Sequence, residues 1–354
     1  MENYRIDPSK GLEFGIYTLG DHLPHPKTGE RITAQERIHE IIEYAKLAEQ
    51  AGIDFFSVGE SHQEYFATQA HSVVLSAIAQ ATEKIKISSS STIISTSDPV
   101  RVYEDFSTID LISKGRAEII AGRASRIGLF ELLGYNVNYY EELFEEKFDL
   151  LLKINQEKIV NWNGEFRAPL KNAEVLPRPK EGSLPIWRAV GGTPDSARKA
   201  GLAGVPMMMA HLGGHATAFK RTVDTYREAL EDSGYDPKTM PVATAGFFYA
   251  AETSQQALRE MHPHINEGMK KTNGRGFPWE AFETGAHPHN IMNIGSPQEI
   301  IEKILYQHEV FGHQRYIAQI DFGGMPFEKL QKNIEIIGTE ILPAIKKYTS
   351  KKNI

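Results

Sequence analysis

Short runs of apolar, β-branched and aromatic residues recur along the whole chain. Their composition and length are typical of buried strands. The runs cover residues 12–18, 54–58, 85–89, 117–121, 186–190, 205–209, 243–250 and 315–320. We expect each of them to form one strand.

Stretches with apolar residues at helical spacing lie between these runs. The expected helices cover residues 34–51, 69–83, 100–112, 141–160, 194–202, 216–230, 254–269 and 297–311, and a last one covers 326–348. Eight strands that alternate with eight helices indicate a closed parallel barrel, because doubly wound sheets rarely need so regular a count. We therefore predict an α/β protein whose residues 1–354 form a single (β/α)8 TIM barrel.

Two insertions interrupt this alternation. Residues 161–185 carry four of the 18 prolines, and we expect a short hairpin packed over the barrel. Residues 262–296 are rich in Gly, His, Pro and Asn and fall between the seventh and eighth strands. Long βα loops lie at the catalytic face of such barrels, so this second insertion is a candidate lid. A decorative loop or a contact between subunits is an equal alternative.

Composition and charge exclude several classes of protein. Of the 354 residues, 41% are hydrophobic and 24% are charged, which allows a large core and excludes a disordered chain. The net charge of −7 makes nucleic acid and anionic membranes poor partners. The chain has no cysteine, so thiolate catalysis and disulfides are absent. The first ten residues lack the apolar core of a signal peptide, and we expect a cytoplasmic protein.

The turn after the fifth expected strand carries the first candidate site. Gly191 and Gly192 precede Thr193, a good helix N-cap, and Pro194, which suits the first helical position. Two glycines either bend the chain or let a ligand approach the backbone, and free amides at a helix start attract a phosphate. An ordinary capped turn is the alternative, and Asp195 would repel an anion if it faced the same way.

Pairs of histidines raise a different hypothesis, a metal-dependent barrel hydrolase. His262 with His264 and His287 with His289 have the residue types that such an enzyme requires. Both pairs fall in the second insertion, however, and not at the end of the first strand. We therefore expect no metal centre.

Several stretches resemble, in their order, those of the bacterial luciferase-like flavin monooxygenases. They are residues 14–21, 58–64, 86–125, the turn at 191–196 and 317–330, with Leu342-Pro343 at the end of the last helix. The most specific part is the block of residues 86–125, which contains Ser113-Lys114-Gly115-Arg116 and Gly122-Arg123. The resemblance extends over about residues 12–345 and implies a barrel that uses reduced FMN and O2.

The resemblance also implies which residues bind the flavin. The phosphate would be held by Gly191, Gly192, Thr193 and Ser196, together with Arg123 at the end of the fourth strand. Read from the residue alone, Arg123 could instead be a surface ion-pair residue. The family often has a cis peptide between non-proline residues at the end of the third strand, and the matching bond here is Ser90-Ser91.

The chain departs from the luciferases at the end of the second strand. Glu60-Ser61-His62 stands where they have Glu-His-His, and the missing histidine is the one assigned the base role, so light emission is not expected. His62 remains as the catalytic candidate, against a purely structural role. Weaker candidates are His211, His22 and His25, and Gln319 and Asp321 are expected to pin the loop after the eighth strand.

The implied chemistry is the transfer of one oxygen atom from O2 to a small organic substrate at reduced FMN. We expect Phe14, Phe55, Phe56 and Trp187 to line a dry barrel mouth. The chain has no dinucleotide-binding fingerprint, which indicates a separate NAD(P)H-dependent flavin reductase or direct reduction. The chain is expected to form a homo-oligomer. A deazaflavin cofactor and a non-catalytic flavin-binding protein remain alternatives.

Overall fold

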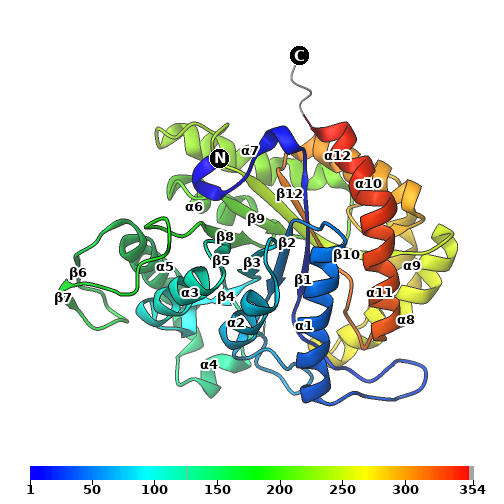
Figure 1. Ribbon diagram of the computed structural model, residues 1–354, viewed down its shortest axis with the longest axis horizontal. Coiled ribbons are helices and arrows are strands. Elements are labelled where there is room, and N and C mark those ends of the chain that lie inside the picture. The colour runs from blue at the N-terminus through cyan, green and yellow to red at the C-terminus, as the bar shows by residue number, and fades with distance from the viewer. Residues whose placement is uncertain (125, 351–354) are drawn as a thin grey trace.

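Eight parallel strands form the centre of the computed structural model, which describes residues 1–124 and 126–350; Ser125, in the block of residues 86–125, lies outside them. The strands are β1 (Glu13–Thr18), β2 (Phe55–Val58), β3 (Lys86–Ser89), β5 (Ala117–Gly122), β8 (Ile186–Val190), β9 (Met207–Ala210), β10 (Val242–Ala250) and β12 (Arg315–Gln319). Each strand pairs with the next, and β12 pairs with β1, which closes the barrel (Figure 1). The predicted (β/α)8 barrel is confirmed.

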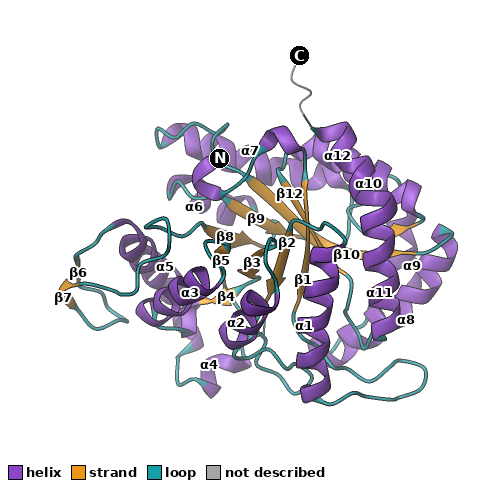
Figure 2. Ribbon diagram, viewed as in Figure 1, coloured by secondary structure: helices purple, strands orange, loops and turns teal. Residues whose placement is uncertain are grey.

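Helices surround the strands on the outside (Figure 2). They are α1 (Ala34–Gln50), α2 (His71–Ala81), α3 (Pro99–Ile112), α4 (Gly128–Leu132), α5 (Tyr140–Gln156), α6 (Pro194–Leu202), α7 (Ala216–Asp232), α8 (Ser254–Asn273), α9 (Trp279–Glu283), α10 (Pro297–Phe311), α11 (Phe327–Ile336) and α12 (Leu342–Thr349). A π-helical turn at Ile337–Ile341 interrupts the expected last helix. Local signals set several of the helix starts; Thr33 and Glu36, for example, form a capping box at α1.

The first insertion contains the expected hairpin. Strands β6 (Val160–Trp162) and β7 (Leu170–Ala173) pair antiparallel. The carboxylate of Glu146 on α5 accepts hydrogen bonds from the backbone amides of residues 165–167 at 2.7–3.1 Å. The hairpin therefore lies beside α5, away from the barrel axis (Figure 1), and the expectation that it packs over the barrel is wrong, because the segment follows a helix and not a strand.

The second insertion is more regular than its composition indicates. Helix α8 was expected to end at residue 269, but it continues to Asn273, where Gly274 ends it in the left-handed conformation with φ of 72°. Helix α9 follows, and strand β11 (Asn293–Gly295) then pairs with β10. The irregular part of this insertion therefore begins at Gly274, twelve residues after its expected start.

The hydrophobic core has two layers, one inside the barrel and one between the strands and the helices. Phe55 and Trp187 belong to the inner layer, whereas Phe14 and Phe56 belong to the outer layer. All four side chains are fully buried. The expectation that they line the barrel mouth is wrong, because each stands at the first or second residue of its strand and so lies toward the amino end of the barrel.

A buried ion-pair network supports the amino end of the barrel. The guanidinium of Arg315 donates to both carboxylate oxygens of Glu118 at 2.8 and 3.1 Å and to Glu13 at 2.9 Å. The same guanidinium lies over the rings of Phe55 and Trp187, at 4.1 and 4.9 Å from their centroids. Paired charges and aromatic faces together offset the cost of burying this arginine.

Candidate active site

A cavity of about 320 Å³ opens at the carboxyl ends of the strands. Catalytic sites of (β/α)8 barrels occur at this end, where side chains from several strands converge. Its lining includes Ser90, Ser91, Arg123 and Gly191, four of the residues expected from the sequence. Methyl and aliphatic groups of Ala189, Met208, Ala210 and Ala245 form an apolar part of the wall. The cavity thus combines polar groups from β3, β5 and β8 with an apolar surface from β8, β9 and β10.

Arg123 links the end of β5 to the start of α6. Its Nη2 donates to the Ser196 hydroxyl at 2.9 Å, and its Nη1 pairs with Glu141 at 2.5 Å. The guanidinium lies 5.6 Å from the centroid of the Phe144 ring, and the side chain is 19% exposed. Two of the expected phosphate-binding residues, Arg123 and Ser196, are therefore in direct contact, and the ion pair with Glu141 also fits the alternative reading.

The turn between β8 and α6 leaves room for a ligand. Gly192 has φ of 85°, a conformation that favours glycine, and a Cβ at Gly191 would have no neighbour within 4 Å among the described residues. Thr193 is the N-cap residue of α6, but its side chain makes no capping hydrogen bond within the described chain. The turn therefore offers a hydroxyl and backbone amides to an anion at the positive end of the helix dipole.

Asp195 does not face this turn. Its side chain is 83% exposed, and its nearest cationic partner is Lys199, 3.9 Å away along the same helix. Lys199 also lies 3.6 Å from Glu141. The repulsion expected from Asp195 is therefore small, and Glu141 is the carboxylate that would compete with a phosphate for Arg123.

The polar end of β3 forms the floor of the cavity beside β5. The Ser90-Ser91 peptide bond is cis, which confirms that expectation. Backbone atoms crowd this segment: a Cβ at Gly59 would lie 2.1 Å from the Ser90 carbonyl oxygen, and one at Gly122 would lie 2.2 Å from the Ser91 hydroxyl. Glycine at these two positions is what lets the serines lie against the ends of β2 and β5.

His62 contacts the cavity through Glu60. Its Nε2 lies 2.7 Å from one carboxylate oxygen of Glu60, and the other oxygen accepts from the Ile93 amide at 2.5 Å. Glu60 lines the cavity, whereas His62 is not among the lining residues. The sequence placed the catalytic candidate at the correct strand end, but in this structure the carboxylate of Glu60 is the group that faces the cavity.

The weaker histidine candidates lie outside this cavity. His211 is fully buried, and burial lowers its pKa to about 4. His22 contacts the Ile32 carbonyl oxygen at 3.3 Å, and Nδ1 of His25 accepts from the amides of Lys27 and Thr28 at 3.3 and 3.2 Å. The contacts of His22 and His25 with nearby backbone indicate a structural role, whereas the two ring nitrogens of His211 have no hydrogen-bond partner among the described residues.

Gln319 and Asp321 pin the end of β12, as the sequence indicated. The Tyr17 hydroxyl donates to Gln319 at 2.7 Å, and the carboxylate of Asp321 accepts from Tyr44 at 3.2 Å. Asp321 also forms a buried ion pair with Arg37. Both residues hold the strand and its loop in place.

Lining residues that the sequence did not single out include Glu60, Arg126 and Tyr17. Glu60 was quoted only as part of a motif, and strand alternation would place it on the outer face with Val58; it reaches the cavity because β2 ends at Val58 and the chain leaves the strand there. Arg126 lies in the loop between β5 and α4, where no periodic pattern in the sequence predicts which way a side chain points. Its Nε is buried and has no hydrogen-bond partner among the described residues, which marks it as a group able to bind a ligand.

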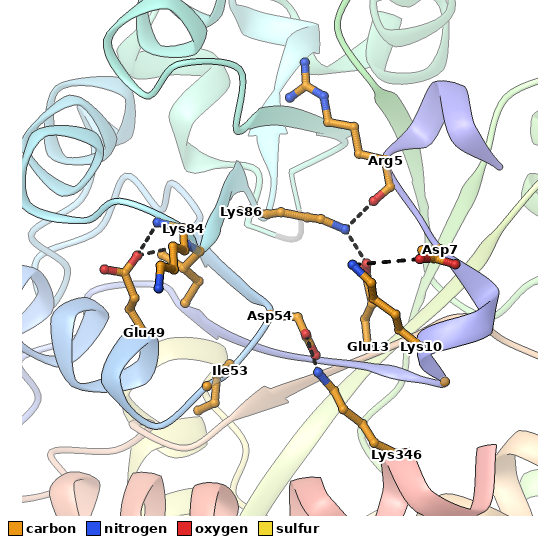
Figure 3. A pocket seen from close by; sticks show the side chains of 13 residues that line it. Arg5, Asp7, Lys10, Glu13, Glu49, Ile53, Asp54, Lys84, Lys86 and Lys346 are labelled. Atoms are coloured by element: carbon orange, nitrogen blue, oxygen red, sulfur yellow. Dashed lines mark hydrogen bonds and ion pairs between the residues drawn. The ribbon is translucent and has the colours of Figure 1, made fainter. Parts of the chain in front are cut away.

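A second pocket lies at the opposite, amino end of the barrel (Figure 3). Its charged side chains are mostly satisfied by one another: Lys346 pairs with Asp54 at 2.6 Å and Lys86 pairs with Glu13. Glu49 accepts from the backbone amides of residues 83–85. Paired charges at the amino end indicate a structural role, so the cavity at the carboxyl end is the candidate site.

Comparisons with known proteins identify the family and agree with the fold. Residues 12–314 match the family model described as luciferase-like monooxygenase. The chain is 20% identical over 364 residues to the alkanal monooxygenase alpha chain of Photorhabdus laumondii subsp. laumondii, an alignment that covers 95% of this chain and 98% of that protein.

Solved structures share the fold. The oxygenating constituent of 3,6-diketocamphane monooxygenase from Pseudomonas putida, in complex with FMN, superposes with a TM-score of 0.73 at 18% identity and covers 94% of this chain and 98% of that one. An F420-dependent secondary alcohol dehydrogenase superposes with a TM-score of 0.72 at 19% identity, covering 95% and 99%. Within residues 1–124 and 126–350, no helix has the length and apolar character needed to cross a membrane.

Proposed function

Because the chain belongs to the luciferase-like monooxygenase family, we propose that it is an FMN-dependent monooxygenase that oxidises a small organic substrate with O2. One observation carries the proposal. Arg123 and Ser196 meet where the turn of Gly191 and Gly192 enters α6, at the edge of the cavity. A guanidinium, a hydroxyl and the positive end of a helix dipole together form a site for a phosphate group.

The phosphate of FMN would lie against Arg123, Thr193 and Ser196, and its flavin ring would extend into the cavity. The apolar wall formed by Ala189, Met208 and Ala245 would pack against the ring. Reduced FMN, once bound, supplies the electrons that activate O2. The part of the protein in this chemistry is to bind the cofactor, exclude water and orient the substrate.

Besides Arg123, two charged residues, Arg126 and Glu60, line the cavity. Burial lowers the pKa of Arg126, and Asp21 and Tyr17 oppose this effect, so the guanidinium stays charged at neutral pH. A cation near the flavin ring stabilises the anionic reduced form. Glu60, held by His62 and the Ile93 amide, faces the cavity from the side of β2. We assign His62 the role of orienting the Glu60 carboxylate, which would hold a proton near the substrate.

Three alternatives remain for the cofactor and the activity. One solved structure with this fold is described as F420-dependent, and the same phosphate site would hold a deazaflavin such as F420. A non-catalytic flavin-binding protein would keep Arg123 and the glycine turn but turn over no substrate. The third, a metal-dependent hydrolase, is disfavoured because His262 and His264 contact the carbonyl oxygens of Phe277 and Gly323, each at 2.8 Å. His287 and His289, the other pair, are not among the residues that line the cavity.

The remaining expectations about partners concern the whole enzyme. A separate NAD(P)H-dependent flavin reductase, a homo-oligomer and a cytoplasmic location all stay predictions.

The candidate lid is reduced to the segment from Gly274 to Gly295, because the preceding residues form helix α8. Slower trypsin cleavage at the exposed Arg275 on addition of reduced FMN would support a lid, and unchanged cleavage would contradict it.

The proposed function is tested by anaerobic titration with FMN, riboflavin and F420, each in the reduced form. We expect FMN to bind at least tenfold more tightly than riboflavin, because only FMN carries the phosphate. Tighter binding of F420 than of FMN would replace the proposal with the deazaflavin alternative. Equal affinity for FMN and riboflavin would remove the phosphate site.

A further inference from the structure

Three histidines from two distant segments lie together beside the second insertion. His215 follows β9, and His287 and His289 precede β11. One ligand atom from each residue can be chosen so that all three lie within 4.8 Å of one another. The ring centroids are 5.2 Å (His215–His289), 5.3 Å (His287–His289) and 5.7 Å (His215–His287) apart. We call these three residues the histidine triangle.

Backbone hydrogen bonds hold the two segments together. The Ala216 amide donates to the His289 carbonyl oxygen at 2.8 Å, and the Ile291 amide donates to the Gly214 carbonyl oxygen at 2.9 Å. His215 and Asn290 form an antiparallel bridge between them. The backbone therefore sets the position of the histidine triangle.

Two side chains of helix α10 hold the second insertion in place. The buried ammonium of Lys303 donates to the Met292 carbonyl oxygen at 2.8 Å and also to that of Gly285. The ring of Tyr306 stacks on the ring of His289 with centroids 4.1 Å apart and planes 17° apart. These contacts restrict the motion of His289, so a ligand would meet a ring that is already placed.

The geometry suits a transition-metal ion. A tetrahedral zinc ion with Zn–N bonds of roughly 2.0–2.1 Å needs nitrogen atoms roughly 3.3 Å apart, so each ring would move inward by roughly 0.8 Å or less. His215 and His287 are exposed, which gives an ion access from solvent. His215 Nδ1 lies 2.8 Å from the Thr217 hydroxyl and accepts from the Thr217 amide at 3.4 Å, contacts that hold the ring in place; Nδ1 would instead donate to the hydroxyl once Nε2 binds an ion. Glu283 lines the same hollow as His215 and His287.

We propose that the histidine triangle binds one divalent transition-metal ion, such as zinc, and that the ion ties the second insertion to the loop after β9. Nitrogen ligands favour zinc, nickel and copper over magnesium and calcium. The proposal departs from the expectation of no metal centre, which rested on the position of His287 and His289 in the sequence. The sequence could not show that His215 lies beside them.

Calorimetric titration of the metal-free protein with zinc chloride tests the proposal. We expect one zinc ion per chain with a dissociation constant of micromolar or tighter, and no binding of magnesium chloride. His287→Ala and His215→Ala should each weaken zinc binding by roughly 30-fold or more. His39→Ala removes an exposed histidine on α1 and serves as the control that should bind zinc like the wild type. Equal zinc affinity in the wild type and in His287→Ala would overturn the proposal.

Two further measurements use the wild-type protein alone, without a variant and without bound flavin. Cobalt chloride added to the wild type should give the visible absorption of a nitrogen-ligated tetrahedral ion, and its absence would overturn the site. Zinc should slow amide hydrogen exchange in residues 286–291 by at least tenfold, and unchanged exchange would overturn the tie between the two loops. Because the histidine triangle lies outside the lining of the flavin cavity, failure of the metal site would leave the proposed function unaffected.

Discussion

Replacement of Arg123 by alanine separates a phosphate site from a structural ion pair. Its guanidinium makes two polar contacts, with Ser196 and Glu141, and is 19% exposed. A guanidinium can donate two hydrogen bonds to a phosphate, each of which contributes about 1.5–3 kcal/mol, and solvent reduces their sum at a partly exposed site. We therefore expect Arg123→Ala to weaken FMN binding by roughly 2–3 kcal/mol, which corresponds to a roughly 30- to 150-fold higher dissociation constant.

The assay is anaerobic binding of FMN and of riboflavin to both proteins, followed by fluorescence. Riboflavin affinity should change by less than about threefold, because riboflavin lacks the phosphate. Arg101→Ala is the matched control, since Arg101 also pairs with a carboxylate, Glu104, but is 74% exposed. Glu141→Gln should act in the opposite direction and tighten FMN binding, because it removes the competing carboxylate. Equal losses of FMN and riboflavin affinity in Arg123→Ala would refute the assignment.

Three further predictions follow from the same geometry. His62→Ala should leave FMN affinity within about threefold and slow the reaction of bound reduced FMN with O2 in stopped-flow measurements; parallel loss of both would mean a structural role. Gly59→Ala should lower the free energy of unfolding by roughly 3 kcal/mol in denaturant titrations, because its Cβ would meet the Ser90 carbonyl oxygen. Gly128→Ala, whose Cβ would have no neighbour within 4 Å among the described residues, should change that free energy little, and equal effects of the two substitutions would contradict the prediction. Burial lowers the pKa of His211 to about 4 from the ordinary 6.5, so the free energy of unfolding should fall by roughly 3 kcal/mol as the pH is lowered from about 6.5 to about 4. His211→Phe should remove this part of the pH dependence, and an unchanged pH profile in that variant would contradict the prediction.

Features that depend on local sequence were predictable. Strand positions follow from apolar runs, and the carboxyl ends of parallel strands must meet at one end of a barrel. That rule placed Arg123 and the turn at Gly191 beside one cavity. The resemblance to a known family added the cis bond between Ser90 and Ser91.

Features that depend on contacts between distant segments were not predictable. Glu141 lies beside Arg123, and His215 lies beside His289, because of the course of the loops that connect these segments. Such loops leave no periodic pattern in the sequence. Two errors, by contrast, had signals that could have corrected them. Phe14 stands near the start of its strand, which places it away from the mouth, and Gly274 is a helix-ending signal just past the end of α8.

The central claim is that the cavity at the carboxyl end of the barrel binds reduced FMN and exposes it to O2. The most direct test is to mix the protein anaerobically with reduced FMN, remove unbound flavin, and admit O2 while recording the flavin absorbance. We expect reduced FMN to stay with the wild-type protein, to be lost from Arg123→Ala, and to react with O2 at a rate different from that of free reduced FMN. Failure of the wild type to retain reduced FMN, or retention that is equal in Arg123→Ala, would contradict the account.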